Sequence, residues 1–542
     1  VADGDKPYIM KMCLVLVLLA VIGLTCSITA QYFAAKAAVG FSTGLRHALF
    51  EHIQKLSFSE MDTVGTSTLI TRMTSDINQT QNGVNLVLRL FLRSPFIVFG
   101  AMIMAFTIDV KAALVFVVTI PLLSVVVFGI MLVSIPLYKK VQSALDKVLG
   151  ITRENLTGSR VIRAFNKEDD EIADFNNSND ALTKIQLYVG KISALMNPLT
   201  YVIINGAVVV LVWTGAIRVN SGYITQGEVV ALVNYMSQIL VELIKLANLI
   251  ININKSIACG NRIQAIFELQ PSITDHAVTP VAEEKTEHSG EVPEVVFSHV
   301  GLTYAGAGEE SLTDIDFTVK KGETIGIIGG TGSGKSSVVN LIPRFYDATK
   351  GSVQIEGKDV REYSLEELRE KIGMVLQKAV LFKGTIRENM LWGNENATDE
   401  DIMQALEVAQ AKEFVDKKEG GLDFEIEQGG KNLSGGQRQR MTIARAVVKK
   451  PDILILDDSA SALDFATDAK LRMAIRDMEN KATVFIVSQR AASIMYADKI
   501  IVLDDGQIVG MGTHEELLKQ CEVYQEIYYS QFKKTEDEKE GR

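Results

Sequence analysis

Residues 329–336 carry the clearest chemical signal in the sequence, a glycine-rich loop that ends in lysine and serine. An apolar strand is predicted at residues 324–328, and a helix is predicted to start near Lys335. Backbone N–H groups of such a loop form a cradle for anions together with the helix N-terminus. Lys335 is therefore predicted to reach the β- and γ-phosphates of a nucleotide, and Ser336 to bind Mg²⁺. The predicted nucleotide contacts in this segment are Gly329, Gly330, Thr331, Gly332, Ser333, Gly334, Lys335, Ser336 and Ser337.

A second apolar strand ends in two acidic residues, Asp457 and Asp458. A carboxylate at the end of a buried strand is costly unless it is paired or bound to a metal. Coordination of Mg²⁺ through water would explain Asp457. An ordinary strand-end residue would need no such role, but the glycine-rich loop favours the metal.

The composition divides the chain into an apolar first half and a second half of ordinary composition. The chain has 542 residues, enough for two or three domains, and 47% are hydrophobic. Five runs approach the length that a bilayer requires, at 12–33, 85–107, 112–135, 193–217 and 229–252. The net charge of −11 gives no indication of nucleic-acid binding, and the four scattered cysteines are expected to be free thiols.

The connections between the runs indicate the orientation of the chain. Those assigned to the cytoplasm are rich in lysine and arginine, whereas the external loops, such as 107–111, are short. A helix from residue 12 to about 58 would be roughly 70 Å long, well beyond the roughly 30 Å of hydrocarbon. We therefore expect the spans to project into the cytoplasm. An odd number of spans suggests a further span upstream.

These patterns predict four parts. We expect a transmembrane domain at 1–270, a polar linker at 271–290, a nucleotide-binding domain at 291–532 and a charged tail at 533–542.

The segment Leu433-Ser434-Gly435-Gly436-Gln437 resembles the signature loop of ATP-binding cassette (ABC) proteins. It lies between the glycine-rich loop and the strand that ends at Asp457, in the order of that family. The resemblance implies an α/β P-loop nucleotide-binding domain that uses ATP and Mg²⁺. By the same resemblance, Tyr304 would stack on adenine, and Gln377 would contact Mg²⁺ and face the membrane domain.

In this family ATP lies between the P-loop of one cassette and the signature loop of the other. The residues implied to serve the partner's nucleotide are Ser434, Gly435, Gly436, Gln437 and Asp464, the last in the loop 461–464 that joins two cassettes. The implied metal ligands are Ser336, Gln377 and Asp457.

The first half resembles the membrane domain of ABC exporters. Residues 65–76 are similar to their first cytoplasmic loop, and residues 154–162 to their second. This implies an α-helical domain of the six-span exporter type, with the first span missing from this chain. Two halves would form one transport path. The turns near 60–66 and 160–170 would dock on the cassettes.

Three departures from the family pattern concern hydrolysis. Asp458 stands where the family has the glutamate that polarises the attacking water, and Gln489 stands where it has the switch histidine. Gln428 replaces a glutamate thought to communicate between halves. Drift or an engineered trap would also change these positions, but a trap would normally alter one residue. The pair of changes favours a naturally degenerate site.

The resemblance therefore implies one half of a heterodimeric bacterial multidrug exporter. The expected partners are a second, non-identical half-transporter with the consensus glutamate and histidine, a hydrophobic small-molecule substrate and the lipid bilayer. The protein would be a multi-pass protein of the bacterial cytoplasmic membrane with its cassette in the cytoplasm. Export of lipid or peptide, and an ATP-gated regulatory membrane protein, remain alternatives.

The substrate is poorly encoded. Charges at membrane depth are functional candidates, although Glu242 and Lys245 could simply pair with each other. The polar candidates in or near the spans are Arg89, Arg93, Asn205, Asn234, Gln238, Glu242 and Lys245.

Overall fold

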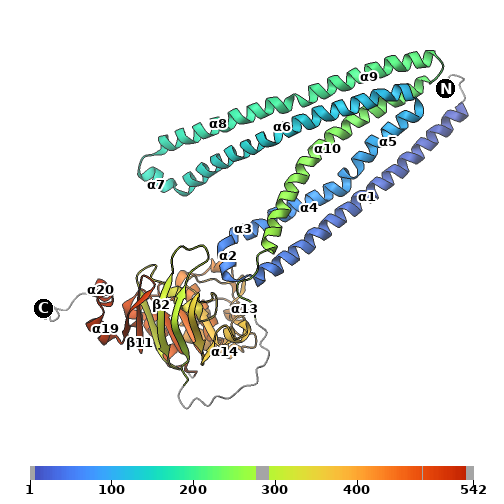
Figure 1. The fold of residues 1–542 in the computed structure, drawn as a ribbon. Coiled ribbons are helices and arrows are strands. Elements are labelled where there is room, and N and C mark those ends of the chain that lie inside the picture. The colour runs from blue at the N-terminus through green and yellow to red at the C-terminus, as the bar shows by residue number, and fades with distance from the viewer. Residues whose placement is uncertain (1–5, 276–291, 479, 533–542) are drawn as a thin grey trace. The chain divides into compact units, whose positions relative to one another are not determined.

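The computed structural model describes residues 6–275, 292–478 and 480–532, and its contacts divide the chain into two compact units (Figure 1). The membrane unit contains the described residues up to Gln54 and those from Ser67 to Glu268. The cassette unit contains Lys55–Thr66 and the described residues from Leu269 onward.

Long helices form the membrane unit. They are α1 (Lys6–Lys55), α3 (Thr66–Thr71), η1 (Arg72–Asp76), α4 (Ile77–Leu86), η2 (Val87–Phe91), α5 (Arg93–Ile108), α6 (Val110–Thr157), α7 (Ser159–Ala164), α8 (Glu168–Ala194), α9 (Met196–Asn220) and α10 (Gln226–Phe267).

Five continuous helical stretches in the described residues are long and apolar enough to cross a membrane, the same number as the apolar runs predicted from the sequence. Each predicted run lies within one of them. The stretches contain 42 to 53 residues. At about 1.5 Å per residue they exceed the roughly 30 Å hydrocarbon layer. The helices are therefore longer than one crossing of the bilayer requires, and their projection into the cytoplasm stays a prediction.

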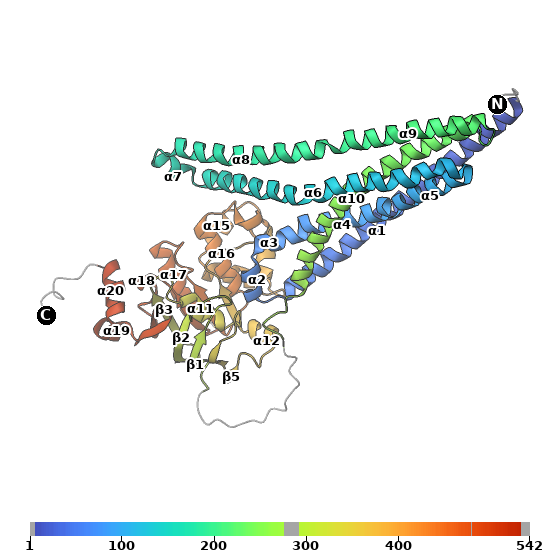
Figure 2. The ribbon, with the colours of Figure 1, turned by 45° about the horizontal axis from the view of Figure 1, so that its top comes forward.

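Helix α10 is the centre of packing in this unit. It contacts α4, α5, α6 and α9, and α6 lies beside α8 over much of its length (Figure 2). Phe116, Leu211 and Met236 are fully buried in the shared core. The burial of these large side chains, one from each of α6, α9 and α10, stabilises the bundle by the hydrophobic effect.

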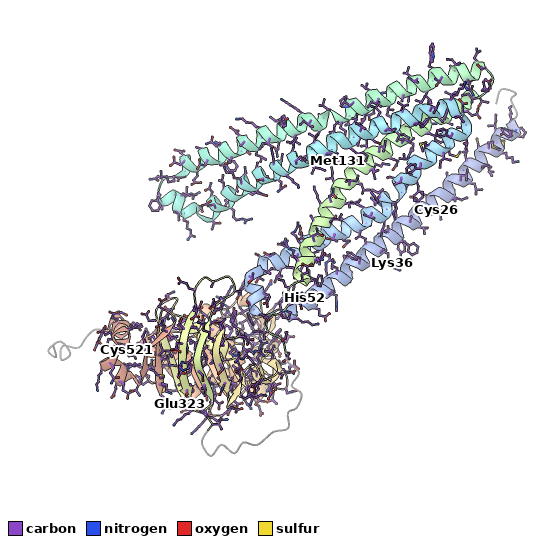
Figure 3. All side chains as sticks on the ribbon, viewed as in Figure 1. Cys26, Lys36, His52, Met131, Glu323 and Cys521 are labelled. Atoms are coloured by element: carbon purple, nitrogen blue, oxygen red, sulfur yellow. The ribbon has the colours of Figure 1, made fainter. Side chains whose placement is uncertain are left out.

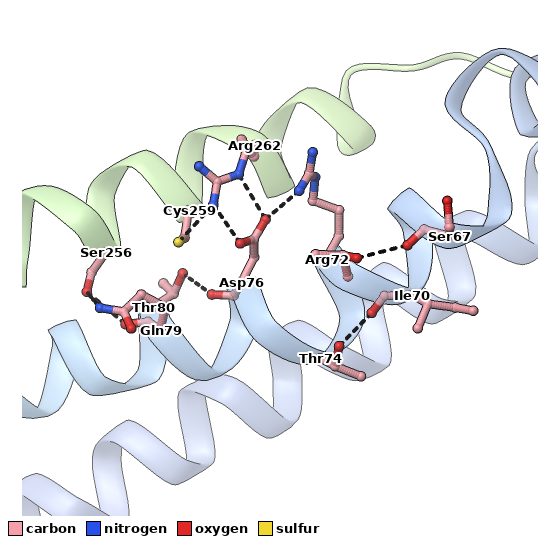
Figure 4. A network of polar contacts seen from close by, with 11 residues as sticks. Ser67, Ile70, Arg72, Thr74, Asp76, Gln79, Thr80, Ser256, Cys259 and Arg262 are labelled. Carbon is pink, nitrogen blue, oxygen red and sulfur yellow. Dashed lines mark hydrogen bonds and ion pairs between the residues drawn. The ribbon is translucent and has the colours of Figure 1, made fainter. Parts of the chain in front are cut away.

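The segments η1 and η2 are π-helical turns within the second long helical stretch, Thr66–Ile108, and only η2 lies in the predicted span 85–107. Asp76, at the end of η1, is buried and accepts two hydrogen bonds from Arg262 of α10, at 2.6 and 3.0 Å (Figure 4). Arg72 donates a third at 2.8 Å, and Arg262 also contacts the Cys259 sulfur. Arg262 thereby ties α10 to η1, and together with Arg72 it compensates the buried charge of Asp76.

The cassette unit contains twelve strands among its described residues. They are β1 (Val295–Leu302), β2 (Leu312–Val319), β3 (Thr324–Gly329), β4 (Lys350–Ile355), β5 (Lys358–Asp359), β6 (Ile372–Val375), β7 (Gly384–Thr385), β8 (Glu425–Ile426), β9 (Ile453–Asp457), β10 (Thr483–Val487), β11 (Lys499–Asp504) and β12 (Gln507–Gly512).

Its helices are mostly short. They are α2 (Phe58–Val64), α11 (Lys335–Leu341), α12 (Leu365–Glu370), α13 (Ile386–Leu391), α14 (Asp399–Val408), α15 (Lys412–Asp416), η3 (Gly421–Asp423), η4 (Gln428–Gly430), α16 (Gly435–Val447), α17 (Phe465–Arg476), α18 (Ala491–Ile494), α19 (His514–Gln520) and α20 (Glu522–Gln531).

A six-stranded sheet with the order β12-β11-β3-β10-β9-β6 forms the centre of the cassette. Strands β11, β3, β10, β9 and β6 run parallel, and an antiparallel sheet, β2-β1-β4-β5, accompanies them. Parallel strands end at the same edge of a sheet, so the loop after β3 and the carboxylates after β9 are brought together. The fold class predicted from the sequence, a helical membrane domain with an α/β P-loop domain, is confirmed.

The boundary between the parts differs from the predicted one in one respect. Residues 55–66, assigned to the transmembrane domain, belong to the cassette unit, because α2 packs on it. The ring of Phe58 lies 4.6 Å from that of Phe345. Most of the predicted linker and the charged tail lie outside the described residues.

Candidate nucleotide-binding site

The glycine-rich loop connects β3 to α11, as the sequence predicts. Gly329 has no room for a side chain, since a Cβ there would lie 2.1 Å from the carbonyl oxygen of Leu503. Gly334 has a φ of +90°, a left-handed conformation that glycine adopts without strain. These two positions let the backbone curl tightly at the N-terminus of α11, where N–H groups can face an anion.

Lys335, the first residue of α11, is buried within the curl of this loop. Its ammonium donates hydrogen bonds to the carbonyl oxygen of Gly329 at 2.9 Å and to the Ser333 hydroxyl at 3.2 Å. Burial lowers the pKa of Lys335, while the nearby carboxylates of Asp457 and Asp458 oppose that shift. The lysine is therefore held by the loop in a position from which it can serve phosphate oxygens.

Asp457 ends β9 and is buried. The Ser336 hydroxyl donates a hydrogen bond of 2.9 Å to its carboxylate. Burial raises the pKa of Asp457, and the neighbouring Asp458 raises it further. The charge of this buried carboxylate is therefore poorly stabilised by the protein itself. A carboxylate beside a hydroxyl offers the oxygen ligands that a hard divalent cation requires. Ser336 and Asp457 thus fit the predicted Mg²⁺.

Asp458 follows Asp457 and lines the same cavity, with its backbone in the left-handed region at φ 45°. Its N–H donates to the carbonyl oxygen of Val487 at 3.0 Å, and its carbonyl oxygen accepts from Ser461. Burial raises the pKa of Asp458, and a hydrogen bond from the Gln377 side chain counteracts this. These backbone and side-chain contacts limit the positions that the Asp458 carboxylate can occupy.

These side chains surround one cavity of about 470 Å³. Most of the predicted residues line it, including Tyr304, Gln377 and Gln489. Six lining residues were not predicted: Glu310, Ser311, Val487, Ser488, Asp505 and Gly506. The Asp-Gly pair marks the hairpin turn between β11 and β12, which the sequence does reveal. Its place beside the loop depends on the sheet order and could not be read from the sequence.

Tyr304 connects this cavity to α2. Its hydroxyl donates to Ser337 at 2.9 Å, and its ring meets that of Tyr346 edge to face at 5.0 Å. The Tyr346 hydroxyl donates to the carboxylate of Asp62 in α2 at 2.5 Å. Burial and Asp62 both raise the pKa of Tyr346, so the phenol stays protonated and acts as the donor. The residue expected to stack on adenine is therefore two contacts away from α2.

The signature loop does not take part in this cavity. Ser434 is an exposed N-cap of α16, and Gln437 completes a capping box with it, through an Oε1 that accepts the Ser434 N–H at 3.0 Å. Asp464 is an exposed N-cap of α17 whose carboxylate accepts the Thr467 N–H at 3.1 Å. The predicted residues thus fall into two sets, one around the cavity and one on a separate exposed surface.

Comparison with known proteins identifies the family. Residues 1–243 match the ABC transporter transmembrane region, and residues 312–461 match the ABC transporter domain. A solved structure of a bacterial Atm1-family ABC exporter with ATP bound has the same fold, with a TM-score of 0.76 and 22% identity over 98% of this chain and 93% of that one. The chain belongs to the ABC transporters, and its fold is that of an exporter.

The chain is also similar to curated bacterial proteins. An uncharacterized ABC transporter ATP-binding protein of Mycobacterium tuberculosis is 37% identical over 98% of this chain and 90% of its own length. The putative multidrug export ATP-binding/permease protein YgaD of Bacillus subtilis is 34% identical, with coverages of 92% and 85%. The ATP-dependent lipid A-core flippase of Desulfotalea psychrophila is 33% identical, with coverages of 90% and 84%. ATP-driven transport by a membrane-embedded protein follows from this membership.

Proposed function

We propose that this chain is one half of a heterodimeric exporter that binds Mg²⁺ and ATP at its own site but hydrolyses that ATP slowly. The geometry of Asp458 carries the proposal. The side chain of aspartate is one C–C bond shorter than that of the family's glutamate, a difference of roughly 1.5 Å. A misplacement of that size can cost about 10²-fold in rate.

The backbone gives Asp458 little freedom to compensate. Its N–H and carbonyl oxygen are both engaged, and its carboxylate interacts with Gln377. A shift toward the attacking water would have to disrupt these contacts. A glutamate in the same place would reach further without any movement of the backbone.

Gln489 supports the same interpretation. It lies at the cavity, where the family has a histidine. A glutamine can donate a hydrogen bond to the γ-phosphate but cannot carry the positive charge of a protonated histidine. Charge-assisted hydrogen bonds are roughly twice as strong as neutral ones, so stabilisation of the transition state is weaker.

The exposed surface made by Ser434, Gly435, Gly436, Gln437 and Asp464 favours a partner chain. Its side chains are engaged only in local helix caps, and the loop retains the complete signature sequence. We infer that it completes the ATP site of a partner that carries the consensus glutamate and histidine. That mixed site would perform the faster hydrolysis.

The cargo that we propose is a hydrophobic compound, moved out across a bacterial cytoplasmic membrane. The multidrug and flippase names of the relatives are compatible with drug or lipid cargo. ATP binding would close the cassettes on each other, and hydrolysis would release them, which biases the membrane unit between two states.

The test is to purify this chain alone and together with a half-transporter that carries the consensus glutamate and histidine, and to measure ATPase activity and uptake into inside-out vesicles. We expect slow hydrolysis by the single chain and faster, vanadate-sensitive hydrolysis with uptake by the pair. Full-speed uptake by this chain alone would contradict the partner requirement. Hydrolysis by the pair without uptake of any tested cargo would favour the regulatory alternative.

A further inference from the structure

The segment that follows β10 carries the residue at the switch position. It consists of Ser488, Gln489 and Arg490, and it leads into the short helix α18. Gln489 lines the nucleotide cavity. In the proposed function its amide donates a hydrogen bond to the γ-phosphate of ATP, and such a bond requires a distance of about 3 Å between donor and acceptor. The backbone of this segment must therefore be held in place.

The side chain of Gln531 holds this segment from a position 42 residues further along the chain. Gln531 is the last residue of α20. Its Nε2 donates a hydrogen bond of 2.7 Å to the carbonyl oxygen of Gln489, and its Oε1 accepts the Ala491 N–H at 2.9 Å. Ala491 begins α18, so its N–H has no partner within that helix. One amide group thus satisfies a backbone acceptor and a backbone donor two residues apart.

Glutamine is the residue type that suits this double contact. Its side chain offers both N–H donors and a carbonyl acceptor. A glutamate in its place would have no donor for the Gln489 carbonyl oxygen, and an alanine would offer neither group. Gln531 is itself exposed, so its substitution leaves the buried side of α20 intact.

Helix α20 is anchored in the core of the cassette, which holds Gln531 in place. Figure 3 marks Cys521, the residue directly before this helix. Cys521 and Tyr524 are buried in the same hydrophobic core as Ala491. The Tyr524 hydroxyl lies 2.7 Å from Nδ1 of His514 in α19. Burial raises the pKa of Tyr524 to about 12 and lowers the pKa of His514, so the protonated phenol donates to a neutral ring.

The same segment also contacts the loop that leads to the signature surface. The guanidinium of Arg490 donates hydrogen bonds to three carbonyl oxygens of this loop, at 3.3, 3.1 and 3.1 Å, those of Ala460, Leu463 and Ser461. The loop ends at Asp464, the N-cap of α17. A displacement of the segment would therefore affect both the cavity and a residue assigned to the partner's ATP.

We propose that Gln531 is a positioning residue for Gln489, which fixes the backbone of residues 489–491 so that the Gln489 amide meets the γ-phosphate. The site thereby favours ATP over ADP, because ADP lacks the phosphate that this contact requires. Gln531 acts through the backbone, since it is not one of the described residues that line the cavity. This inference rests on the proposed function and adds a means by which the site retains ATP.

The test uses the complete transporter, this chain with its partner half. Azido-ATP and azido-ADP, each radiolabelled on the α-phosphate, are titrated on ice with Mg²⁺ and crosslinked by light, and the two chains are separated by gel electrophoresis. The labelling of this chain gives an apparent affinity for each nucleotide at its own site. The variants are Gln531→Ala, Gln531→Glu, Gln489→Ala and the double Gln531→Ala/Gln489→Ala. Gln520→Ala is the matched control, because Gln520 is an exposed glutamine at the end of α19.

We expect Gln531→Ala to weaken the binding of azido-ATP about fivefold to tenfold, as for the loss of a hydrogen bond to a charged group, and to leave azido-ADP within about twofold. Gln489→Ala should give the same selective loss, and the double variant should lose no more than either single one. Gln531→Glu should lose at least as much as Gln531→Ala, since a carboxylate cannot donate to the Gln489 carbonyl oxygen. Gln520→Ala should match the wild type.

Three results would overturn the proposal. Equal weakening of both nucleotides by Gln531→Ala would show a general structural role. Additive losses in the double variant would show that the two glutamines act separately. Equal binding of both nucleotides by the wild type would remove the contact with the γ-phosphate. The unfolding temperature of each variant shows whether it is folded.

Failure of this inference is distinguishable from failure of the proposed function. A pair with ATPase activity and uptake, in which Gln531→Ala leaves the preference for ATP unchanged, would refute the positioning role alone. Full-speed uptake by this chain alone would refute the partner requirement. A selective loss of azido-ATP in Gln531→Ala, which can also be measured on the single chain, would then still support the positioning role.

Discussion

The nucleotide cavity and the signature surface both use serine and aspartate side chains. They differ in whether those side chains contact the rest of their site. Around the cavity, Lys335, Ser336 and Asp457 contact one another or the loop, and they are buried or half-buried. On the signature surface, Ser434 and Asp464 are exposed and contact only their own helix ends. The first set can bind nucleotide within one chain, whereas the second needs a ligand from outside. In the proposed heterodimer, this chain contributes the P-loop half of one shared site and the signature half of the other.

The largest effect is expected from Lys335→Ala, which tests the complete side of the comparison. Loss of the buried ammonium removes charge-assisted bonds worth roughly 1.5–3 kcal/mol each. We expect about 100-fold weaker binding of a fluorescent ATP analogue by the isolated chain. Lys519→Ala, which removes an exposed lysine of α19 that does not line the cavity, is the control. Unchanged affinity for the analogue would refute the assignment of the loop.

Ser434→Ala tests the incomplete side. If its hydroxyl serves the partner's ATP, hydrolysis by the mixed complex should fall by about 10- to 100-fold. Loss of the N-cap alone would destabilise α16 by about 1 kcal/mol. Ser364→Ala removes an equivalent N-cap, that of α12, and serves as the matched control. A similar ATPase loss in both variants would mean that Ser434 acts only through the helix.

Asp458→Glu tests whether the short side chain at this position limits hydrolysis of ATP that the cavity already binds. We expect less than about tenfold faster turnover by the single chain, because Gln489 and the absence of a consensus partner still limit the rate. Asp458→Asn, which keeps the shape and removes the charge, provides the lower bound. Single-turnover hydrolysis measures both. Turnover by the single Asp458→Glu chain at the rate of the mixed complex would end the argument for a partner.

Asp457→Asn tests whether the buried carboxylate that would bind Mg²⁺ lowers the stability of the folded protein. The native pKa of Asp457 lies above its ordinary value of 3.8, so the native state holds the proton more tightly than the unfolded chain. The resulting penalty is absent below about pH 3.8 and grows as pH rises toward the native pKa. Above that range, the variant without nucleotide should be more stable by on the order of 1 kcal/mol.

Thermal unfolding across pH 4–8, with and without Mg²⁺ and ATP, measures the difference in stability between the variant and the wild type. The exposed Asp477→Asn is the control. Asp457→Asn should also lose most of the stabilisation by Mg²⁺ and ATP. A variant that is less stable at pH 8 than the wild type would show that the carboxylate is well compensated.

The smallest effect is expected from Asp62→Asn, at the contact between α2 and Tyr346. Asp62 is exposed, so the lost hydrogen bond is worth no more than about 1 kcal/mol. Cargo-stimulated ATPase activity should fall about twofold to threefold, with little change in ATP affinity. Tyr346→Phe should behave alike, and the double variant should be no worse than either single one. Additive losses would mean that the two side chains act separately.

Much of the architecture could be predicted because it depends on local patterns. The five apolar runs, the glycine-rich loop before Lys335 and the strand before Asp457 each require only nearby residues. The inclusion of residues 55–66 in the cassette unit was missed, since the packing of Phe58 on Phe345 joins segments almost 300 positions apart. The places of Glu310 and Asp505 at the cavity were missed for the same reason.

By itself, the sequence determined the class of the protein, the phosphate-binding loop and the departures at Asp458 and Gln489, because residue type and spacing suffice for each. The tertiary structure alone decided which side chains share a cavity and which backbone groups they hold. Sheet order brings the ends of β3 and β9 together, and helix packing places Gln531 beside the backbone of Gln489. Those relations depend on contacts between distant segments, which no local pattern records.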